Sequence, residues 1–382
     1  MTFKKFVFFT SCFLIAIGQL NSQNNGLIYA DSLYQTGNYS KAIEVYQSHP
    51  NKAEFNERIA KSYYALGNYG QALKHYDMAL NDFPENALIR YDYAKLLSRT
   101  KKYDEAERQF EELLEADNNN PNYHYEMGLV KEKQRDSLAL SEFGKAYQLD
   151  PTHQKAIFKI AKNLIKIRKH PEAKKLIDIG LNSYAENIEL LSLKAQNYYY
   201  ADQYNQAIPA FNKLLEMGES SEFIHEKLSL SYAADSEYEK AIEQRKLALE
   251  FNPLNTQALF VIGTYYQRLQ NFEKAEEFIL RAIAIEDRPL DHEYQVLATI
   301  LNRQKKHEQA IAMLDKSLQE NPENLGSALY LVTTKDIYYE DRKVVLKLYE
   351  DLRDKHPDTW VASMASRRIK ELKEEQFYAT DD

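Results

Sequence analysis

The side chains best suited to bind a ligand form a basic segment between His153 and Lys175. Eight lysines and arginines and a single acid give these 23 residues a net charge of +7. Four of the lysines are spaced by four, three and four residues, which places them along one stripe of a helix. This lysine stripe consists of Lys155, Lys159, Lys162 and Lys166. A positively charged surface of this kind is suited to hold carboxylate or phosphate groups.

Two interpretations of the lysine stripe are open. A solvated helix face, or pairing of the lysines with acidic neighbours in the same molecule, needs no ligand. Like charges at i,i+4 cost about 0.2–0.5 kcal/mol for each pair, however, and a solvated face normally mixes both signs. The second interpretation is therefore an anionic partner, which would be an acidic protein segment or the phosphate of an envelope glycolipid.

The rest of the sequence carries no recognisable catalytic or metal-binding motif. It contains no Gly-rich phosphate loop, Gly-x-Ser-x-Gly elbow, His-Glu-x-x-His pair or calcium loop. His225-Glu226 and His292-Glu293 are neighbours in sequence and would point about 100° apart on a helix. No pair among the 57 acidic residues stands out. The sequence predicts a protein that is not an enzyme and needs no cofactor or metal.

The composition favours helices as the elements that position these side chains. Glycine and proline number 11 and 10 among 382 residues, too few for the turns of most β architectures. The chain has 49 basic and 57 acidic residues, and its net charge of −8 argues against binding to nucleic acid. Tyrosine is unusually frequent, with 29 residues against one tryptophan. We expect an all-α chain built from a repeated unit.

A repeat runs through the chain. Alanine recurs three residues after an aromatic residue or histidine, although Asp136 takes the aromatic place in the fourth copy. Consecutive alanines are 30, 34, 33, 34, 34, 34, 34 and 35 residues apart. In eight copies a small residue stands twelve positions before the alanine and a large apolar residue or tyrosine nine before it; the fourth copy has lost one residue, and Gly128 takes the small place there. Five copies have tyrosine or phenylalanine four positions after the alanine, and four copies have proline twelve after it. The alanines are Ala42, Ala72, Ala106, Ala139, Ala173, Ala207, Ala241, Ala275 and Ala310.

These columns have a structural reason. Small residues let two helices approach closely, large ones fill the space between them, and proline ends the second helix. The columns resemble the tetratricopeptide repeat, a helix-turn-helix unit with Gly/Ala, Tyr, Ala and Pro at these offsets. The resemblance covers about nine copies over residues 24–325. It implies an all-α, right-handed superhelical solenoid in which each helix pair contacts only its neighbours.

The resemblance and the departures from it predict how the chain is divided. Residues 23–325 form the array of about nine repeats, residues 326–376 a degenerate repeat with capping helices, and residues 377–382 a frayed tail. The first alanine step is four residues short, about one helical turn, so a helix can shorten there without rotating its buried face. The charged residues 367–375 would form the solvated face of the C-terminal cap.

In tetratricopeptide repeats the first helix of each pair lines a concave groove. The resemblance places the lysine stripe on that groove wall beside Phe158. Corresponding positions in other copies are candidate partner contacts: Tyr91, Lys95, Arg99, Gln196, Tyr199, Tyr200, Phe260, Arg268, Asn302 and Arg303. Asp31 and Lys61 stand where some members of the family carry asparagines that grip a terminal carboxylate, so that mode of binding is not supported.

The first 22 residues are predicted to be a signal peptide. Lys4 and Lys5 precede a 12-residue uncharged run, which is too short for a membrane span, and small residues follow. An uncleaved anchor is the alternative. Cys12, the only cysteine, lies within the uncharged run and is badly placed for lipidation, so the exported chain would have no thiol. The end of the segment, Leu20-Asn21-Ser22-Gln23, resembles the signal ends of Bacteroidota export substrates. We expect a periplasmic or cell-surface protein of such a bacterium, with at most peripheral membrane contact.

The predicted function is a non-catalytic scaffold of the bacterial cell envelope. Such a protein would bind a partner protein in the repeat groove, with an acidic segment at the fifth repeat. The alternative is a module that binds a glycan or envelope polymer through groove tyrosines, since tyrosine can stack on sugar rings. No nucleic acid partner is expected, and the oligomeric state is not predicted.

Overall fold

The computed structural model describes residues 26–49, 52–285 and 290–378. In these ranges the chain forms helices joined by turns, and it contains no strand. The all-α prediction is confirmed. The chain divides into two compact units, unit 1 (residues 1–193) and unit 2 (residues 194–382). The predicted signal peptide lies outside the described residues.

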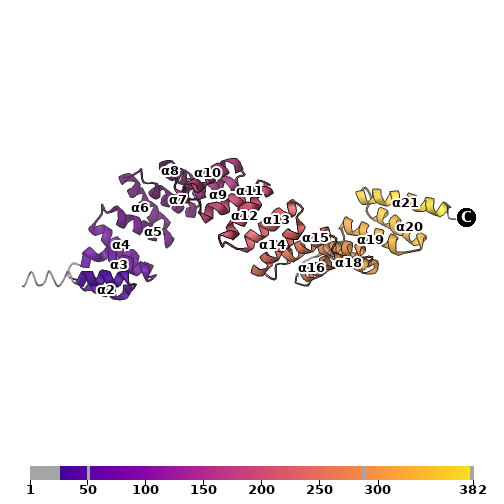
Figure 1. Cartoon of the computed structure of the whole chain (residues 1–382), viewed down its shortest axis with the longest axis horizontal. Coiled ribbons are helices and arrows are strands. Elements are labelled where there is room, and N and C mark those ends of the chain that lie inside the picture. The colour runs from indigo at the N-terminus through magenta and orange to yellow at the C-terminus, as the bar shows by residue number, and fades with distance from the viewer. Residues whose placement is uncertain (1–25, 50–51, 286–289, 379–382) are drawn as a thin grey trace, which may run out of the picture. The chain divides into compact units, whose positions relative to one another are not determined.

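Unit 1 begins with a helix over residues 26–35, and the helices that follow are joined by short turns (Figure 1). They are α2 (Tyr39–Ser48), the 3-10 helix η1 (Lys52–Phe55), α3 (Asn56–Ala65), α4 (Tyr69–Asp82), α5 (Ala87–Arg99), α6 (Tyr103–Ala116), α7 (Pro121–Gln134), α8 (Ala139–Leu149), α9 (Gln154–Lys166) and α10 (His170–Ser183). Helix α11 (Ile188–Tyr200) contributes residues to both units.

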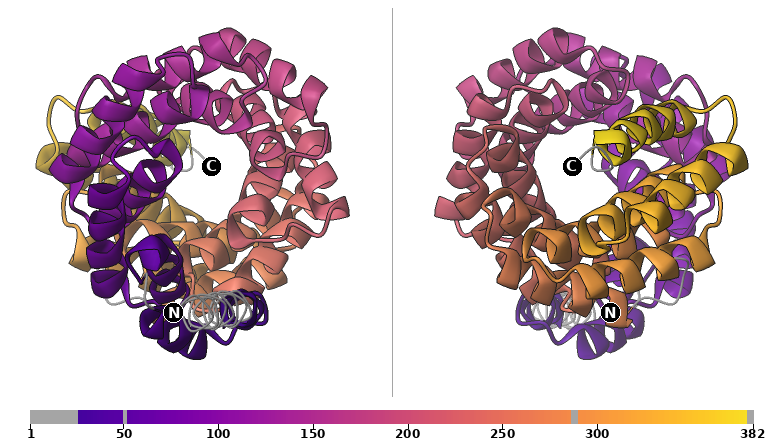
Figure 2. Two further views of the ribbon diagram at one scale, coloured as in Figure 1. Left: turned by 90° about the vertical axis from the view of Figure 1, so that its left-hand side faces the viewer. Right: turned by 90° about the vertical axis from the view of Figure 1, so that its right-hand side faces the viewer.

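Unit 2 continues with the same alternation. Its helices are α12 (Tyr204–Glu216), α13 (Glu222–Ala234), α14 (Tyr238–Phe251), α15 (Thr256–Arg268), α16 (Phe272–Ile285), α17 (Asp291–Arg303), α18 (His307–Glu320), α19 (Leu325–Tyr338), α20 (Arg342–Lys355) and α21 (Trp360–Tyr378). Within each unit a helix packs mainly on its neighbours in sequence, so the pairs are stacked in chain order (Figure 2). No helix in the described ranges is both long enough and apolar enough to cross a bilayer.

The columns read from the sequence form the core of these pairs. Eight of the nine column alanines are fully buried, and Ala139 in the fourth copy is 7% exposed. Four residues after the alanine a large side chain fills the space between two pairs, as with Tyr46, Tyr76, Phe110 and Phe211. Each such burial contributes about 1.5–3 kcal/mol. The large side chains therefore hold consecutive pairs together.

The short first repeat has the predicted form. Helix α2 has 10 residues, whereas α4, α6 and α10 have 14, so the missing turn was removed from the end of a second helix. Ala42, Ile43 and Tyr46 of α2 are still buried. Because one turn was removed whole, the buried face keeps its direction.

A column of capping residues, which the sequence reasoning missed, begins most first helices. Each cap accepts a backbone N–H two or three residues later, which contributes about 0.5–2 kcal/mol, and all but the last stand eight residues before the small-residue column. The caps are Asn86, Asn120, His153, Asn187, Ser221, Asn255 and Asn324. Three of them also donate to the first helix of the preceding pair, for example Asn324 Nδ2 to Asp291 Oδ2 at 2.8 Å.

The turn inside most pairs passes through a residue in the left-handed region. The first two pairs have glycine there, Gly37 and Gly67. The next seven have other residues with φ between 56° and 65°: Lys101, Arg135, Arg168, Asp202, Ser236, Gln270 and Lys305. The following N–H then bonds back to the end of the first helix, as from Lys102 to the Leu97 carbonyl at 2.9 Å. This geometry ends the first helix and starts the second within three residues.

Helices α19 and α20 form a tenth pair, and α21 covers it. Val345 and Tyr349 are buried in the alanine and aromatic columns of that pair. Helix α21 buries Val361, Ala365, Ile369 and Leu372, while Ser363, Ser366, Arg367 and Lys370 are exposed. One face of α21 is therefore buried against the tenth pair and the other is polar. Apart from the end of α21, the tail predicted for residues 377–382 lies outside the described residues.

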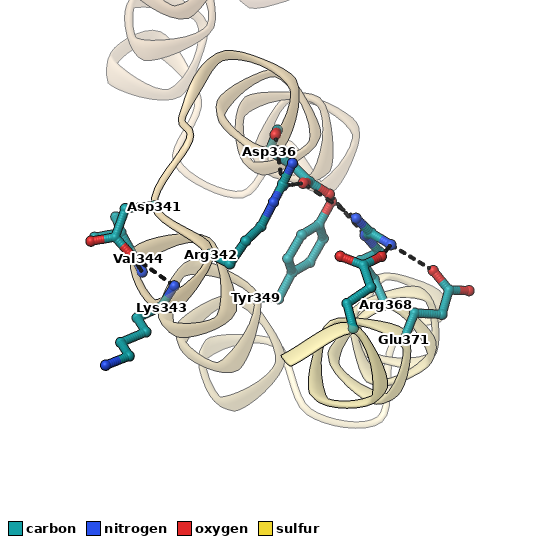
Figure 3. A network of polar contacts seen from close by, with 9 residues as sticks. Asp336, Asp341, Arg342, Lys343, Val344, Tyr349, Arg368 and Glu371 are labelled. Atoms are coloured by element: carbon teal, nitrogen blue, oxygen red, sulfur yellow. Dashed lines mark hydrogen bonds and ion pairs between the residues drawn. The ribbon is translucent and has the colours of Figure 1, made fainter. Parts of the chain in front are cut away.

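The cap is fastened by one carboxylate. Asp336 at the end of α19 accepts hydrogen bonds from Arg342 Nη1 at 2.7 Å, Arg368 Nε at 2.9 Å and the Tyr349 hydroxyl at 3.1 Å. Figure 3 shows these side chains converging on Asp336 from α20 and α21. Arg368 also pairs with Glu371 at 3.0 Å on its own helix. Asp336 thus links all three C-terminal helices.

Candidate functional site: a cationic face on unit 1

The lysine stripe lies on the solvent-exposed side of α9. His153 caps this helix by accepting the Ala156 N–H at its Nδ1 atom, at 3.1 Å. Ala156, Ile157, Ala161 and Ile165 are buried, which directs the opposite side of the helix to solvent. Lys155, Lys162 and Lys166 are exposed and Lys159 is half-buried. The four lysines are therefore presented together by the amphipathic pattern of a single helix.

Lys159 is satisfied within the molecule. Its Nζ atom lies 2.6 Å from Glu132 Oε2 of α7 and 5.7 Å from the centre of the Phe143 ring. Among the residues that the structure describes, Lys155, Lys162 and Lys166 form no ion pair within 4.0 Å. Lys162 Nζ instead lies 5.7 Å from the centre of the Phe158 ring. Intramolecular pairing thus accounts for one lysine of the stripe and leaves three with free charges.

Helix α7 brings an acid between the basic side chains of α5 and α9. Glu126 Oε1 lies 3.8 Å from Lys95 Nζ and accepts a hydrogen bond from the Tyr91 hydroxyl at 3.4 Å. Burial raises the pKa of Glu126, while Lys95 and Lys155 act in the opposite direction. Glu126 therefore lies within the electrostatic reach of both helices and joins them into one charged surface.

We call this surface the cationic face. It comprises Lys95, Glu126, Glu132, Lys155, Lys159, Lys162 and Lys166. Five lysines and two glutamates leave a surplus of three positive charges on a chain whose net charge is −8. Its field attracts anionic groups and disfavours cationic ones.

Cations lie over three tyrosines of unit 1: Tyr91 and Tyr64, whose repeat positions face the predicted groove, and Tyr69, which begins a second helix. Lys95 Nζ lies 4.9 Å from the centre of the Tyr91 ring. The Arg99 guanidinium lies 5.5 Å from the Tyr64 ring and 5.1 Å from the Tyr69 ring, and it donates to the Tyr64 hydroxyl at 2.9 Å. The faces of these rings are engaged in cation–π contacts.

The remaining candidate contacts lie in unit 2, on other helices. Tyr199 and Tyr200 of α11 meet edge to face at 5.3 Å, and Phe260 of α15 lies 5.5 Å from the His292 ring. Arg268 and Arg303 are exposed at the ends of α15 and α17, and Gln196 is half-buried on α11.

Asn302 is engaged at both ends of its amide. It donates to Thr334 Oγ1 at 2.7 Å, and its Oδ1 atom lies 3.1 Å from His307 Nδ1. A partner contact at Asn302 would compete with these bonds. The fifteen candidate residues are therefore divided between the two units, and unit 1 contains the group that converges on the cationic face.

Sequence reasoning missed the acids of the cationic face and one residue of unit 2. Glu126 stands two residues before the small-residue column, and Lys159 occupies the same repeat position in the next copy. The position of Glu126 on the cationic face could therefore have been predicted from the repeat. Arg245 stands in the aromatic core column, where other copies have Tyr46, Phe110 or Phe211. In the described residues, no group of three or more His, Cys, Asp or Glu side chains could hold a metal ion.

Comparison with family models identifies repeats in both units. Residues 63–127 match one tetratricopeptide repeat model, and residues 256–288 and 294–324 match another. Tetratricopeptide repeats are thus supported in unit 1 and in unit 2.

Solved structures of helical-repeat proteins align with the chain at low similarity. YrrB, described as a TPR protein with an unusual peptide-binding site, has a TM-score of 0.44 and 18% identity over 48% of this chain and 95% of its own. A tetratricopeptide repeat protein from Parabacteroides merdae has a TM-score of 0.46 and 14% identity, over 66% of this chain and 98% of its own. Pseudomonas aeruginosa PilF has a TM-score of 0.44 and 19% identity, over 52% and 93%. At this level the alignments carry no inference about function.

Proposed function

Because both units match tetratricopeptide repeats, which generally serve as protein-interaction scaffolds, we propose that this chain is a non-catalytic scaffold. Its partner would be a protein with an acidic segment, and the segment would bind at the cationic face of unit 1. The observation that carries the proposal is the set of three exposed lysines on α9, Lys155, Lys162 and Lys166, which form no ion pair within 4.0 Å in the described residues.

The arrangement suits recognition of an extended acidic chain. The lysines lie at i, i+7 and i+11 on one helix, and a residue of α-helix rises 1.5 Å, so they span about 16 Å along the helix axis. An extended segment of about five residues covers that length. Lysine is a compact charge on a flexible stem, so it can follow a partner whose carboxylates are not rigidly placed.

A glycan partner has less support from the groove tyrosines. Stacking on a sugar needs an open aromatic face, and cations already lie over Tyr64, Tyr91 and Tyr199. Tyr200, which is 47% exposed, is the candidate tyrosine best placed to stack on a sugar ring. The proposal therefore favours a protein partner over a glycan.

We also propose that the scaffold works in the bacterial cell envelope, after export by the N-terminal 22 residues. The support is the sequence alone: two lysines, a 12-residue uncharged run and small residues at the end of the segment. Detection of the mature chain in a periplasmic or surface fraction, with an N-terminus after residue 22, tests this part. A full-length chain that stays with the cytoplasmic fraction would contradict it.

The acidic-segment proposal can be tested by charge reversal. Lys155→Glu, Lys162→Glu and Lys166→Glu in one chain should weaken binding of a hexaglutamate probe peptide by at least about tenfold, because each exposed pair contributes about 0.2–1 kcal/mol and reversal adds repulsion. The matched control reverses three exposed lysines of unit 1 outside the first helices, Lys74, Lys169 and Lys175.

The two triple variants carry the same change in net charge, so a general electrostatic effect would weaken both equally. Equal weakening, or unchanged binding in the α9 variant, would refute the cationic face as the site. Binding should also weaken as salt rises from low ionic strength, because the lysines are exposed. A hexaglutamine peptide, which lacks the charge, should not bind.

A further inference from the structure

Arg245 of α14 is a charged residue in a core position of unit 2. It is 5% exposed, although it stands in the column where other copies bury tyrosine, phenylalanine, isoleucine or leucine. A buried guanidinium normally needs close carboxylates and a full set of hydrogen-bond acceptors. Among the described residues, its Nε atom has no hydrogen-bond partner.

The carboxylate nearest to Arg245 does not satisfy it. Glu226 Oε1 of α13 lies 3.9 Å from Arg245 Nη1, beyond the 2.7–2.9 Å typical of a charge-assisted hydrogen bond. The same oxygen lies closer to Lys227 Nζ, at 3.3 Å. One carboxylate is therefore shared by two cations, and the group has a surplus of one positive charge.

A second polar atom that is poorly hydrogen-bonded belongs to the same pair of helices. Ser229 occupies the small-residue column of that pair and is fully buried, and its Oγ atom forms no hydrogen bond of good geometry with a described residue, although the Tyr265 hydroxyl lies close to it. In the next pair the corresponding residue, Gly263, faces the corresponding core residue, Ile279, at 2.7 Å from an added Cβ. The repeat geometry therefore directs the Ser229 side chain toward Arg245.

Aromatic side chains lie around the two cations, Arg245 and Lys227. Burial raises the pKa of the Tyr265 hydroxyl, and Arg245 and Ser229 act in the opposite direction, which places all three together. The Lys227 ammonium lies 5.1 Å from the Tyr199 ring and 5.4 Å from the Phe223 ring. Phe223 is 37% exposed and the side chain of Glu226 is 36% exposed, so the group opens to solvent along α13.

We propose that Arg245, Lys227 and Tyr265 form a carboxylate-binding subsite in unit 2, in which Glu226 is an internal competitor. An incoming carboxylate would bridge the two cations at hydrogen-bond distance, which Glu226 does not do for Arg245. The Tyr265 hydroxyl would donate to it, since burial keeps this group protonated. The carboxylate comes from a partner protein, either at its C-terminus or on an acidic side chain. The subsite does not depend on the cationic face of unit 1.

Arg245→Leu separates a binding role from a structural one. Leucine is the residue of this column in the ninth pair, Leu314, so the variant matches a side chain that the fold already accepts. Replacing a buried, poorly paired charge by an apolar residue is often neutral or stabilising. We expect an unchanged or higher Tm together with binding of a carboxylate probe weakened by about tenfold or more. Arg281→Leu, at an exposed arginine of α16, is the matched control and should change neither quantity.

Three short probe peptides distinguish the source of the carboxylate in ligand-observed NMR titrations of the whole chain. The first has a free C-terminus and no acidic residue, the second has an amidated C-terminus and one glutamate, and the third replaces that glutamate by glutamine. Binding of the first or the second, lost in Arg245→Leu, supports the subsite and identifies the source. Equal binding of all three, or binding of none, overturns the proposal.

Glu226→Gln provides a test that does not require a change at the buried position. Removing the internal carboxylate should tighten binding of the preferred probe several-fold, because the competitor is lost while the two cations stay. Weaker or unchanged binding in Glu226→Gln would overturn the competitor role. A Tm lowered by Arg245→Leu with probe binding unchanged would show that Arg245 is structural.

Discussion

Asp336→Asn should destabilise the last three helices of unit 2 and leave the earlier pairs unchanged. The side chain of Asp336 is 13% exposed and accepts hydrogen bonds from Arg342, Arg368 and Tyr349, which come from α20 and α21 (Figure 3). Asparagine keeps the shape but removes the charge, and it turns an N–H donor toward arginines that can only donate. The change therefore removes the link without creating a cavity.

The expected loss follows from the exposure of the partners. Hydrogen bonds to charged groups contribute about 1.5–3 kcal/mol each, against about 1 kcal/mol for neutral ones. The Arg342 side chain is 45% exposed, so its share is reduced by solvent screening. Arg368 is 28% exposed and keeps its pair with Glu371. We expect a loss of about 2–3 kcal/mol, below the 3–5 kcal/mol that breaking a fully buried pair costs.

Hydrogen exchange measured helix by helix is the suitable assay, because helix pairs in a stacked array are stabilised mainly by their neighbours. Amides of α20 and α21 should exchange about 30 to 150 times faster, whereas those of α13 to α16 should not change. The matched control is Asp351→Asn on α20, whose pair with Lys347 at 2.8 Å is exposed on both sides and contributes little. Equal effects of the two variants, or faster exchange throughout unit 2, would refute the reasoning.

The same carboxylate predicts a dependence on pH. Burial acts to raise the pKa of Asp336, but the hydrogen bonds and charge of Arg368 and the Tyr349 hydroxyl outweigh it, so the pKa is lowered. A group whose pKa is lower in the folded state stabilises the fold fully above its unfolded value of about 3.9. That contribution is lost as pH falls through the lowered pKa. Protection of α21 should therefore fall in acid, and Asp336→Asn should remove this part of the dependence.

Further substitutions test the packing, the turns and one buried acid. Gly263→Ala should cost about 1–3 kcal/mol, because its Cβ would lie 2.7 Å from Ile279 Cδ1. Gly144→Ala, where a Cβ meets nothing within 4 Å on α8, should stabilise by about 0.5–1 kcal/mol; the opposite order in thermal unfolding would contradict the packing argument. Lys305→Gly should stabilise by about 0.5 kcal/mol, because φ is 61° there, and a lower Tm would show that the turn is not strained. Burial acts to raise the pKa of Glu142, but hydrogen bonds from two neighbouring side chains outweigh it, so the pKa is lowered. The stability that this carboxylate contributes is therefore lost as pH falls. Protection of the α7 and α8 amides from exchange should fall in acid, and a Glu142→Gln variant should not show this dependence on pH.

Much of the fold follows from local patterns, and those could be predicted. The alanine column, the large side chains four residues later and the proline twelve residues later depend only on helix periodicity and steric size, which act within one repeat. The same logic predicted that the four missing residues of the first repeat would shorten one helix by one turn, as α2 shows. Capping residues such as Asn86 were missed but could have been predicted as well, since they stand at a fixed distance from the small-residue column.

The sequence by itself thus determined the helix pairs and the alignment of four lysines along one stripe of a helix. Only the tertiary structure decided which of those charges are free, because an ion pair depends on distances between side chains of different helices. It paired Lys159 with Glu132, left Lys155, Lys162 and Lys166 exposed, and buried Arg245 with a carboxylate too far away to satisfy it. The columns specify the backbone, but rotamers and the rotation of neighbouring helices set those distances. For that reason the candidate sites could be identified from the packed helix pairs but not from the repeat pattern alone.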